Sequence, residues 1–392
     1  MNGIQYPRLG YYGAMAGNGV PLLNTDGSLN LTNLSKQAMW DVPILDVYPV
    51  VHRPDILDAL RTLNPFAECI MYVVMRWWQN PNPALGPRHE DFAWRFFEIT
   101  NRETNGALYQ TDGATYPAGD NWVNLSNHET CTALADLIVA HAGRWDGVLL
   151  DDFCPGFGGN PGIDYVRAGH QTWEGFRAAW EMGHRLLSVR VKNGIGAKPL
   201  VFNYGVDVHP DIMSGGMREG FPFQNVGEPP LMDGWQGNML LNPWGKRGYL
   251  KEQYAEPHLS VLVSDPRAGM AMSAQRLRFG LGSATLDDGI HSFKRGENDA
   301  VWVRNHLDWW FPEYTFGKGQ KGSGKGWLGR ALGEAYKLST GVWTRDFERG
   351  AVFVNPTLTV QNASTPLMRK HDGPAKRAWV IPSQDAILLQ RQ

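Results

Sequence analysis

The 392-residue sequence predicts a (β/α)8 TIM barrel followed by a small C-terminal β domain. Short apolar runs recur up to residue 293, and they are continuous rather than alternating, as in parallel strands that are buried on both faces. Segments with helical spacing of apolar residues separate several of these runs, and this order of elements is typical of a barrel. A doubly wound open sheet is the alternative architecture for the same order.

Eight apolar runs are the expected strands. They comprise residues 7–13, 42–49, 69–75, 147–153, 199–205, 214–221, 259–265 and 284–293. Helices are expected within residues 53–65, 128–143 and 172–192, where apolar side chains recur at helical spacing. Asn64 and Pro65 end the first of these helices.

The composition of the chain changes after the eighth run. We expect the barrel to occupy residues 1–315 and a Gly- and Lys-rich loop to occupy residues 316–340. Residues 341–392 contain short β segments separated by turns, which predict the small β domain.

Charge and composition exclude several classes of function. The formal net charge is −2, from 37 basic and 39 acidic residues, so no nucleic-acid partner is expected. No apolar stretch approaches the length of a membrane span, and the N-terminus lacks the pattern of a signal peptide. We therefore expect a chain that is cytoplasmic as synthesised or carried on a phage particle or another delivery assembly.

Polar side chains gather where the expected strands end, and in a barrel the carboxyl ends of the strands build the active site. The carboxylates at these positions are Asp46, Asp151, Asp152, Glu219, Asp287 and Asp288. Further candidates for substrate contact near these ends are Trp77, Trp78, Asn203, Tyr204 and Trp235. Acids at several strand ends, together with aromatic residues that can stack on sugar rings, indicate a site for glycoside hydrolysis. This reaction needs two carboxylates across a cleft.

An ordered series of motifs resembles a known family. The series comprises "LRTLNPFAECIMYVVM", "NWVNLSN", "WDGVLLDDF", "FNYG" with "GGMREGF", and "GVWTRDFERGAVFVNP". Its order and spacing resemble the glycoside-hydrolase-like barrels related to endo-α-1,4-polygalactosaminidases. The resemblance implies that the acids closing the fourth and sixth strands, Asp151 and Glu219, are the catalytic pair.

Asp151 and Asp152 are adjacent carboxylates at the end of one expected strand, and the question is which of the two faces the barrel mouth. Side chains alternate along a strand, so only one of Asp151 and Asp152 faces the barrel mouth. The motif register favours Asp151. If Asp151 acts in its ionised form, we expect hydrogen-bond donors around it, from Asn203 or Tyr204.

Two other classes of function remain open. The first is a non-catalytic carbohydrate-binding or virion protein on a glycosidase-like barrel. The second is a metal-dependent enzyme that uses the Asp cluster. The sequence contains no H-x-x-x-H or H-E-x-x-H arrangement, so neither a metal nor another cofactor is expected.

Overall fold

The structure is a computed structural model of the whole chain. It describes residues 4–12, 21–77, 92–101, 107–108, 121–157, 159–203, 209–221, 235, 239, 254–264, 274–293, 310–317 and 324–392.

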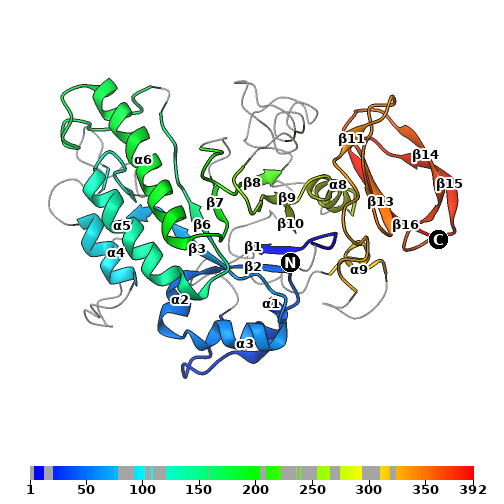
Figure 1. Cartoon of the computed structure of the whole chain (residues 1–392), viewed down its shortest axis with the longest axis horizontal. Coiled ribbons are helices and arrows are strands. Elements are labelled where there is room, and N and C mark those ends of the chain that lie inside the picture. Colours follow the sequence, from blue (N-terminus) through cyan, green and yellow to red (C-terminus); the bar gives the residue numbers. More distant parts are fainter. Residues whose placement is uncertain are drawn as a thin grey trace.

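Eight parallel strands form one sheet that curls into a barrel (Figure 1). In spatial order they are β1 (Gly10–Tyr12), β2 (Val42–Asp46), β3 (Ile70–Val74), β6 (Gly147–Asp151), β7 (Leu200–Asn203), β8 (Gly215–Phe221), β9 (Val261–Ser264) and β10 (Ile290–Phe293). A parallel bridge between Leu9 and His291 joins the last strand to the first. The fold prediction is therefore confirmed, and the open-sheet alternative is wrong because the two edges of the sheet meet.

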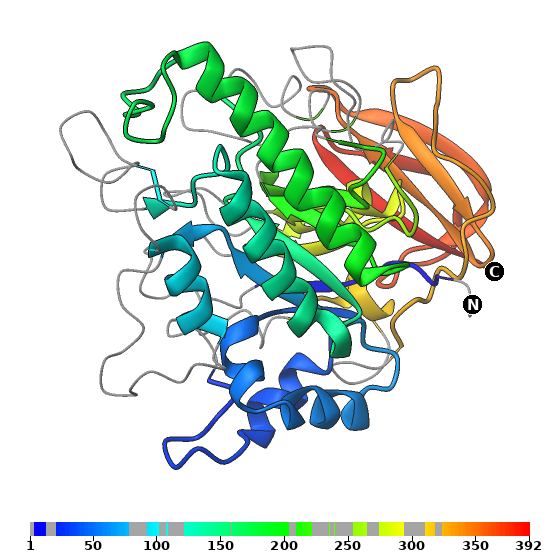
Figure 2. The ribbon, with the colours of Figure 1, turned by 60° about the vertical axis from the view of Figure 1, so that its left-hand side comes forward.

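Helices cover the outside of the first half of the barrel. They are α1 (Leu31–Gln37), α2 (Val47–His52), α3 (Asp55–Leu63), α4 (Phe92–Asn101), α5 (His128–His141) with the short 3-10 turn η2 (Ala142–Arg144), and α6 (Trp173–Ile195). The three helices expected from spacing are α3, α5 and α6. The side chains of Asn127 and Thr172 cap the first turns of α5 and α6. Figure 2 shows α5 and α6 side by side across the sheet.

The barrel interior is filled by residues at alternate strand positions. Ile44, Tyr72, Leu149, Val201 and Val263 belong to one buried cluster inside the sheet. The intervening residues of the strands pack outward, against the helices or the C-terminal sheet. Because Asp151 follows Leu149 by two positions, its side chain is on the interior side of β6.

The eighth strand begins later than the sequence predicts. Helix α8 (Ala274–Thr285) continues through the first residues of the expected strand, and β10 starts only at Ile290. Leu277, Leu281 and Ala284 are buried on this helix, so the apolar residues before the strand complete a helical face. Asp287 and Asp288 therefore precede β10 and lie at the amino end of the barrel.

Six antiparallel strands form a second sheet at the C-terminus. They are β11 (Tyr336–Lys337), β12 (Trp343–Phe347), β13 (Gly350–Asn355), β14 (Gln361–Arg369), β15 (Lys376–Ile381) and β16 (Asp385–Arg391), in the spatial order β11-β12-β13-β16-β14-β15. Strands β4 (Arg76–Trp77) and β5 (Asn121–Trp122) form a separate two-stranded antiparallel sheet that follows β3.

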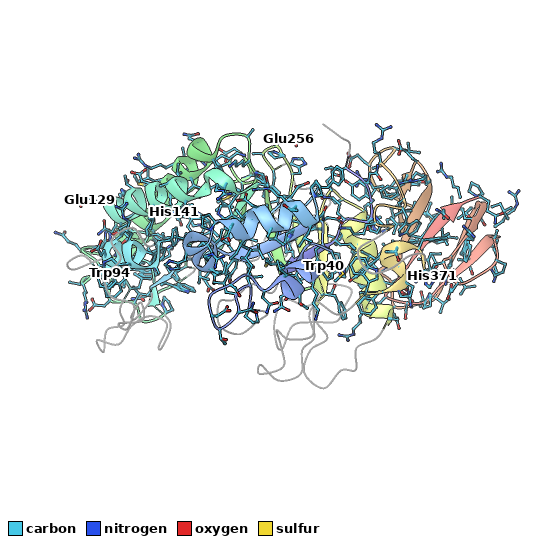
Figure 3. The ribbon with its side chains drawn as sticks, turned by 90° about the horizontal axis from the view of Figure 1, so that it is seen from below. Trp40, Trp94, Glu129, His141, Glu256 and His371 are labelled. Carbon is cyan, nitrogen blue, oxygen red and sulfur yellow. The ribbon has the colours of Figure 1, made fainter. Side chains whose placement is uncertain are left out.

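Helix α8 lies between the barrel and the C-terminal sheet (Figure 1). A Cβ atom on Gly282 would come within 2.4 Å of the Ala386 Cβ, so glycine permits this close approach. The Arg278 guanidinium forms two hydrogen bonds with Asp385, at 3.0 and 2.6 Å. Figure 3 shows His371 in this C-terminal unit and Trp94 at the opposite end of the molecule. The short helix α9 (Pro312–Thr315) precedes the C-terminal sheet.

None of the helices in the described ranges combines the length and the apolar character that crossing a lipid bilayer requires.

Candidate active site

Asp151 lies at the carboxyl end of the barrel between two neighbouring strand ends. It is the last residue of β6, and it pairs in register with Asn203 on β7 and with Val74 on β3. Only 5% of its surface is exposed. A carboxylate in this position needs hydrogen-bond donors, because burial of an unpaired charge costs several kcal/mol.

Three neutral groups among the described residues donate hydrogen bonds to the Asp151 carboxylate. The Asn203 Nδ2 group donates to Oδ1 at 2.7 Å, and the backbone N–H of Asp152 donates to the same oxygen at 2.9 Å. The Tyr72 hydroxyl donates to Oδ2. Hydrogen bonds to both oxygens favour the ionised form of a carboxyl group. The expectation that Asn203 serves as a donor is confirmed, and Tyr72 is a donor that the sequence did not reveal.

Asp152 contributes through its backbone. Its φ angle is +52°, in the left-handed region that most residues avoid and that Asp and Asn tolerate best. This conformation accompanies the turn of the chain out of β6 and directs the Asp152 N–H to the carboxylate of Asp151. The two adjacent acids therefore have different positions, with Asp151 buried and Asp152 partly exposed.

Helix α6 anchors the segment that follows β6. The Trp180 Nε1 group donates to the Cys154 carbonyl at 2.9 Å. The His184 Nε2 atom lies 3.3 Å from the Phe153 carbonyl. Burial lowers the pKa of His184 to about 3, so the ring is neutral near pH 7 and its Nε2–H is the donor to this carbonyl. Two side chains of one rigid helix thus position the chain directly after the candidate carboxylates.

Asp46 also lies at the carboxyl end of the barrel. It is the last residue of β2, is buried, and pairs in register with Tyr72. Tyr72 is therefore positioned between two acid-bearing strand ends, and it donates to Asp151.

Four other predicted positions have no described side chain. Glu219 lies within β8, where its backbone pairs in register with Val263, and Trp77 lies within β4 opposite Asn121. Their side chains are outside the described part of the structure, as are residues Trp78 and Tyr204.

Trp235 lies away from the carboxyl end of the barrel. Its indole is fully buried, donates to the Ser283 hydroxyl at 3.0 Å on α8, and contacts Trp343 of the C-terminal sheet. The prediction that Trp235 forms part of a cleft wall is therefore wrong. Its apolar ring instead fills the junction between α8 and the second sheet.

Asp287 and Asp288 lie at the end of the barrel opposite Asp151. Asp288 accepts hydrogen bonds from the Tyr6 hydroxyl at 2.5 Å and from Arg345 Nη2 at 3.0 Å. The structure does not bring these two acids together with Asp151, because they precede their strand instead of following it. They belong to the junction between the barrel and strand β12.

A partly exposed aromatic group in segments connected to Asp151 is the second feature that the sequence did not reveal. It comprises Trp122 on β5, Phe157 in the loop after β6, and Trp173 at the start of α6. A weak signal was present, because Trp122 is the second residue of the "NWVNLSN" motif and Phe157 follows the Asp pair closely. Within the described ranges, no group of three or more His, Cys, Asp or Glu side chains is arranged to hold a metal ion.

Comparison with known proteins identifies the family. The chain resembles the solved structures of an α-galactosidase, AgaA, from Geobacillus stearothermophilus (TM-score 0.51, 9% identity) and an α-galactosidase from Lactobacillus brevis (TM-score 0.50, 9% identity). These matches cover 98% and 99% of this chain but 55% of each α-galactosidase, so this chain spans about half of their length. At this identity the likeness shows a shared fold.

The maltogenic α-amylase AmyB from Thermotoga neapolitana also matches, with a TM-score of 0.48 and 9% identity over 92% of both chains. No curated protein sequence matches the chain. The sequence model of hypothetical glycosyl hydrolase family 15 matches residues 114–351, which is more than half of the chain and includes β6, β7 and β8. The protein belongs to hypothetical glycosyl hydrolase family 15.

Proposed function

We propose that the protein hydrolyses a glycosidic bond, with Asp151 as the ionised carboxylate and Glu219 as the second, acidic carboxyl group. The observation that carries this proposal is the buried Asp151 at the carboxyl end of a barrel, held by donors on both of its oxygens. The membership of the chain in a glycosyl hydrolase family supports the same reaction class.

The proposed roles follow from the surroundings of Asp151 and from the position of Glu219 along β8. An ionised Asp151 serves either as the nucleophile at the anomeric carbon or as the base that activates water. Glu219 is assigned as the proton donor because it lies in the neighbouring part of the barrel, two residues after the interior Met217. A general acid protonates the oxygen that leaves with the other half of the substrate.

Carbohydrate is therefore the proposed partner of this protein. The motif order that resembles the polygalactosaminidase-related barrels supports α-1,4-linked galactosamine polymers as the first substrates to test. A non-catalytic carbohydrate-binding protein on the same barrel is the competing proposal, and cleavage assays separate the two.

The experiment uses two kinds of leaving group. A panel of 2,4-dinitrophenyl glycosides needs no proton donor, whereas unactivated oligosaccharides do. We expect Asp151→Asn to lose at least about 10³-fold in kcat on both kinds of substrate, because the attacking or activating carboxylate is gone. Glu219→Gln should lose activity on oligosaccharides and retain most of it on the activated glycosides.

The matched control is Asp136→Asn on α5, an exposed carboxylate that pairs with Arg190. This variant should keep wild-type activity. Equal losses on both substrate types for Glu219→Gln would overturn its role as the acid. If the wild-type protein binds glycans but cleaves none of the panel, the non-catalytic proposal replaces this one.

A further inference from the structure

Three aromatic residues form a partly exposed group in segments connected to the candidate carboxylate, and we call this group the aromatic wall. Its members are Trp122, Phe157 and Trp173. The ring planes of Trp122 and Phe157 are inclined by 30° with centroids 5.9 Å apart, and the ring centroids of Phe157 and Trp173 are 6.1 Å apart. All three are partly exposed, whereas Trp180, which packs 5.0 Å behind Phe157, is buried.

The aromatic wall is connected to Asp151 by backbone hydrogen bonds. The N–H of Met75 donates to the Asp151 carbonyl at 2.9 Å, and the N–H of Val123 donates to the Met75 carbonyl at 3.3 Å. Trp122 therefore precedes Val123, which is connected to Asp151 through Met75 by two backbone hydrogen bonds. Each such step between strands spans about 4.8 Å. Phe157 follows Asp151 by six positions along the chain.

Hydrogen bonds hold both segments of the wall in place. The loop that carries Phe157 is attached to α6 through the bond from Trp180 to the Cys154 carbonyl. Later in the same loop, His170 Nε2 lies 2.9 Å from the Ser126 hydroxyl, in the segment that follows Trp122. A surface that is already ordered binds a ligand without the entropic cost of ordering it.

We propose that the aromatic wall is a binding subsite for a sugar ring of an oligosaccharide or polysaccharide whose scissile bond lies at Asp151. Flat indole faces complement the C–H faces of a pyranose ring, and aromatic side chains dominate the binding energy of such contacts. This inference rests on the proposed function. It adds that the substrate contains further sugar units beyond the two that are joined by the bond that is cut.

The test measures binding without cleavage. Trp122→Ala and Trp173→Ala are each combined with Asp151→Asn, and retardation is compared in affinity gels that contain an α-1,4-linked galactosamine polymer, chitosan, galactomannan, soluble starch or xylan. We expect the Asp151→Asn protein to be retarded by at least one of these polysaccharides. Each Trp→Ala change should weaken that binding about tenfold, and Trp122→Tyr should restore most of it.

Trp94→Ala is the matched control. Trp94 is also partly exposed, but it lies on α4, where its indole donates to Glu98 at 3.0 Å (Figure 3). This variant should bind as the Asp151→Asn protein does, and thermal melting should show that all variants are folded.

Two results would overturn the inference. One is unchanged retardation of both Trp→Ala variants, and the other is the absence of retardation of the Asp151→Asn protein in every gel. The failure of the proposed function is a different result. In that case the wild-type protein would bind polysaccharide through Trp122 and Trp173 and cleave none.

Discussion

The chain contains two Asp-Asp pairs, and the barrel places them at opposite ends. Asp151-Asp152 closes β6 at the carboxyl end, whereas Asp287-Asp288 precedes β10 at the amino end. Both pairs border a strand that is buried along its whole length. The two pairs differ in their described partners, because neutral groups donate to Asp151 whereas a buried guanidinium contacts Asp288.

Asp151 accepts hydrogen bonds from a phenol, an amide and a backbone N–H. Asp288 instead contacts the guanidinium of Arg345, which is only 4% exposed and lies on β12. Burial raises the pKa of Asp288, but the hydrogen bond from Tyr6 and the charge of Arg345 outweigh it and lower the pKa below its usual value. The pair at the amino end thus joins the barrel to the C-terminal sheet.

The largest effect on stability is expected from Asp288→Asn. This change leaves the buried Arg345 without its charged partner and should lower the free energy of unfolding by about 2 kcal/mol. Activity per folded molecule should not change. Urea unfolding measures the loss, and Asp346→Asn, which removes the exposed ion pair with Arg391, should cost less than about 1 kcal/mol. Equal losses in the two variants would contradict the structural role of Asp288.

The variant Tyr72→Phe tests the neutral hydrogen-bond donors around Asp151 at the carboxyl end of the barrel. Removal of the hydroxyl takes away the donor to Asp151 Oδ2, and we expect kcat to fall about tenfold. KM and the melting temperature should change little, because the ring still fills the barrel interior. A fall in stability with unchanged kcat would show that Tyr72 supports only packing.

A pH effect is expected from Asp287. Burial raises its pKa to about 7 in the folded protein, and the charge of Asp288 acts in the same direction. In the unfolded chain the group ionises near pH 4. The folded state therefore binds more protons between about pH 4 and 7, and stability falls as pH rises through this window.

Asp287→Asn removes this titration. Its free energy of unfolding should depend less steeply on pH than that of the wild type between pH 4.5 and 7, and the two curves should run parallel above pH 7.5. Urea unfolding at a series of pH values provides the comparison. Identical slopes in the two proteins would contradict the raised pKa.

The smallest effect is expected from Asp152→Asn. The donor to Asp151 is a backbone N–H, and Asn also tolerates a positive φ, so kcat should change less than about threefold. Asp152→Val should lower kcat more than Asp152→Asn does, because a β-branched residue is strained at φ +52°. If Asp152→Asn is inactive and Asp151→Asn is active, the register at the end of β6 is wrong by one residue.

The sequence by itself determined the order of the barrel strands, the positions of three helices and the position of Asp151 at the end of a strand. Burial on both faces of a parallel sheet requires continuous apolar runs, so strands such as β6 and β9 are visible in the sequence. Helical spacing and the cap residues Asn127 and Thr172 locate α5 and α6 in the same way. These signals are local, and they place Asp151 and Asn203 at neighbouring strand ends.

The tertiary structure alone decided which side chains meet. Tyr72 is bonded to Asp151 because β3 and β6 pair in one register, although the two residues are 79 positions apart. The boundary between α8 and β10 could not be located from the sequence. Apolar residues such as Ala284 and Leu286 are compatible with the pattern of a strand and with the apolar face of a helix. Helix α8 packs against strands β9 and β10 on one side and against the C-terminal sheet on the other. This tertiary burial favours the helix, and Asp287 and Asp288 therefore lie at the amino end of the barrel.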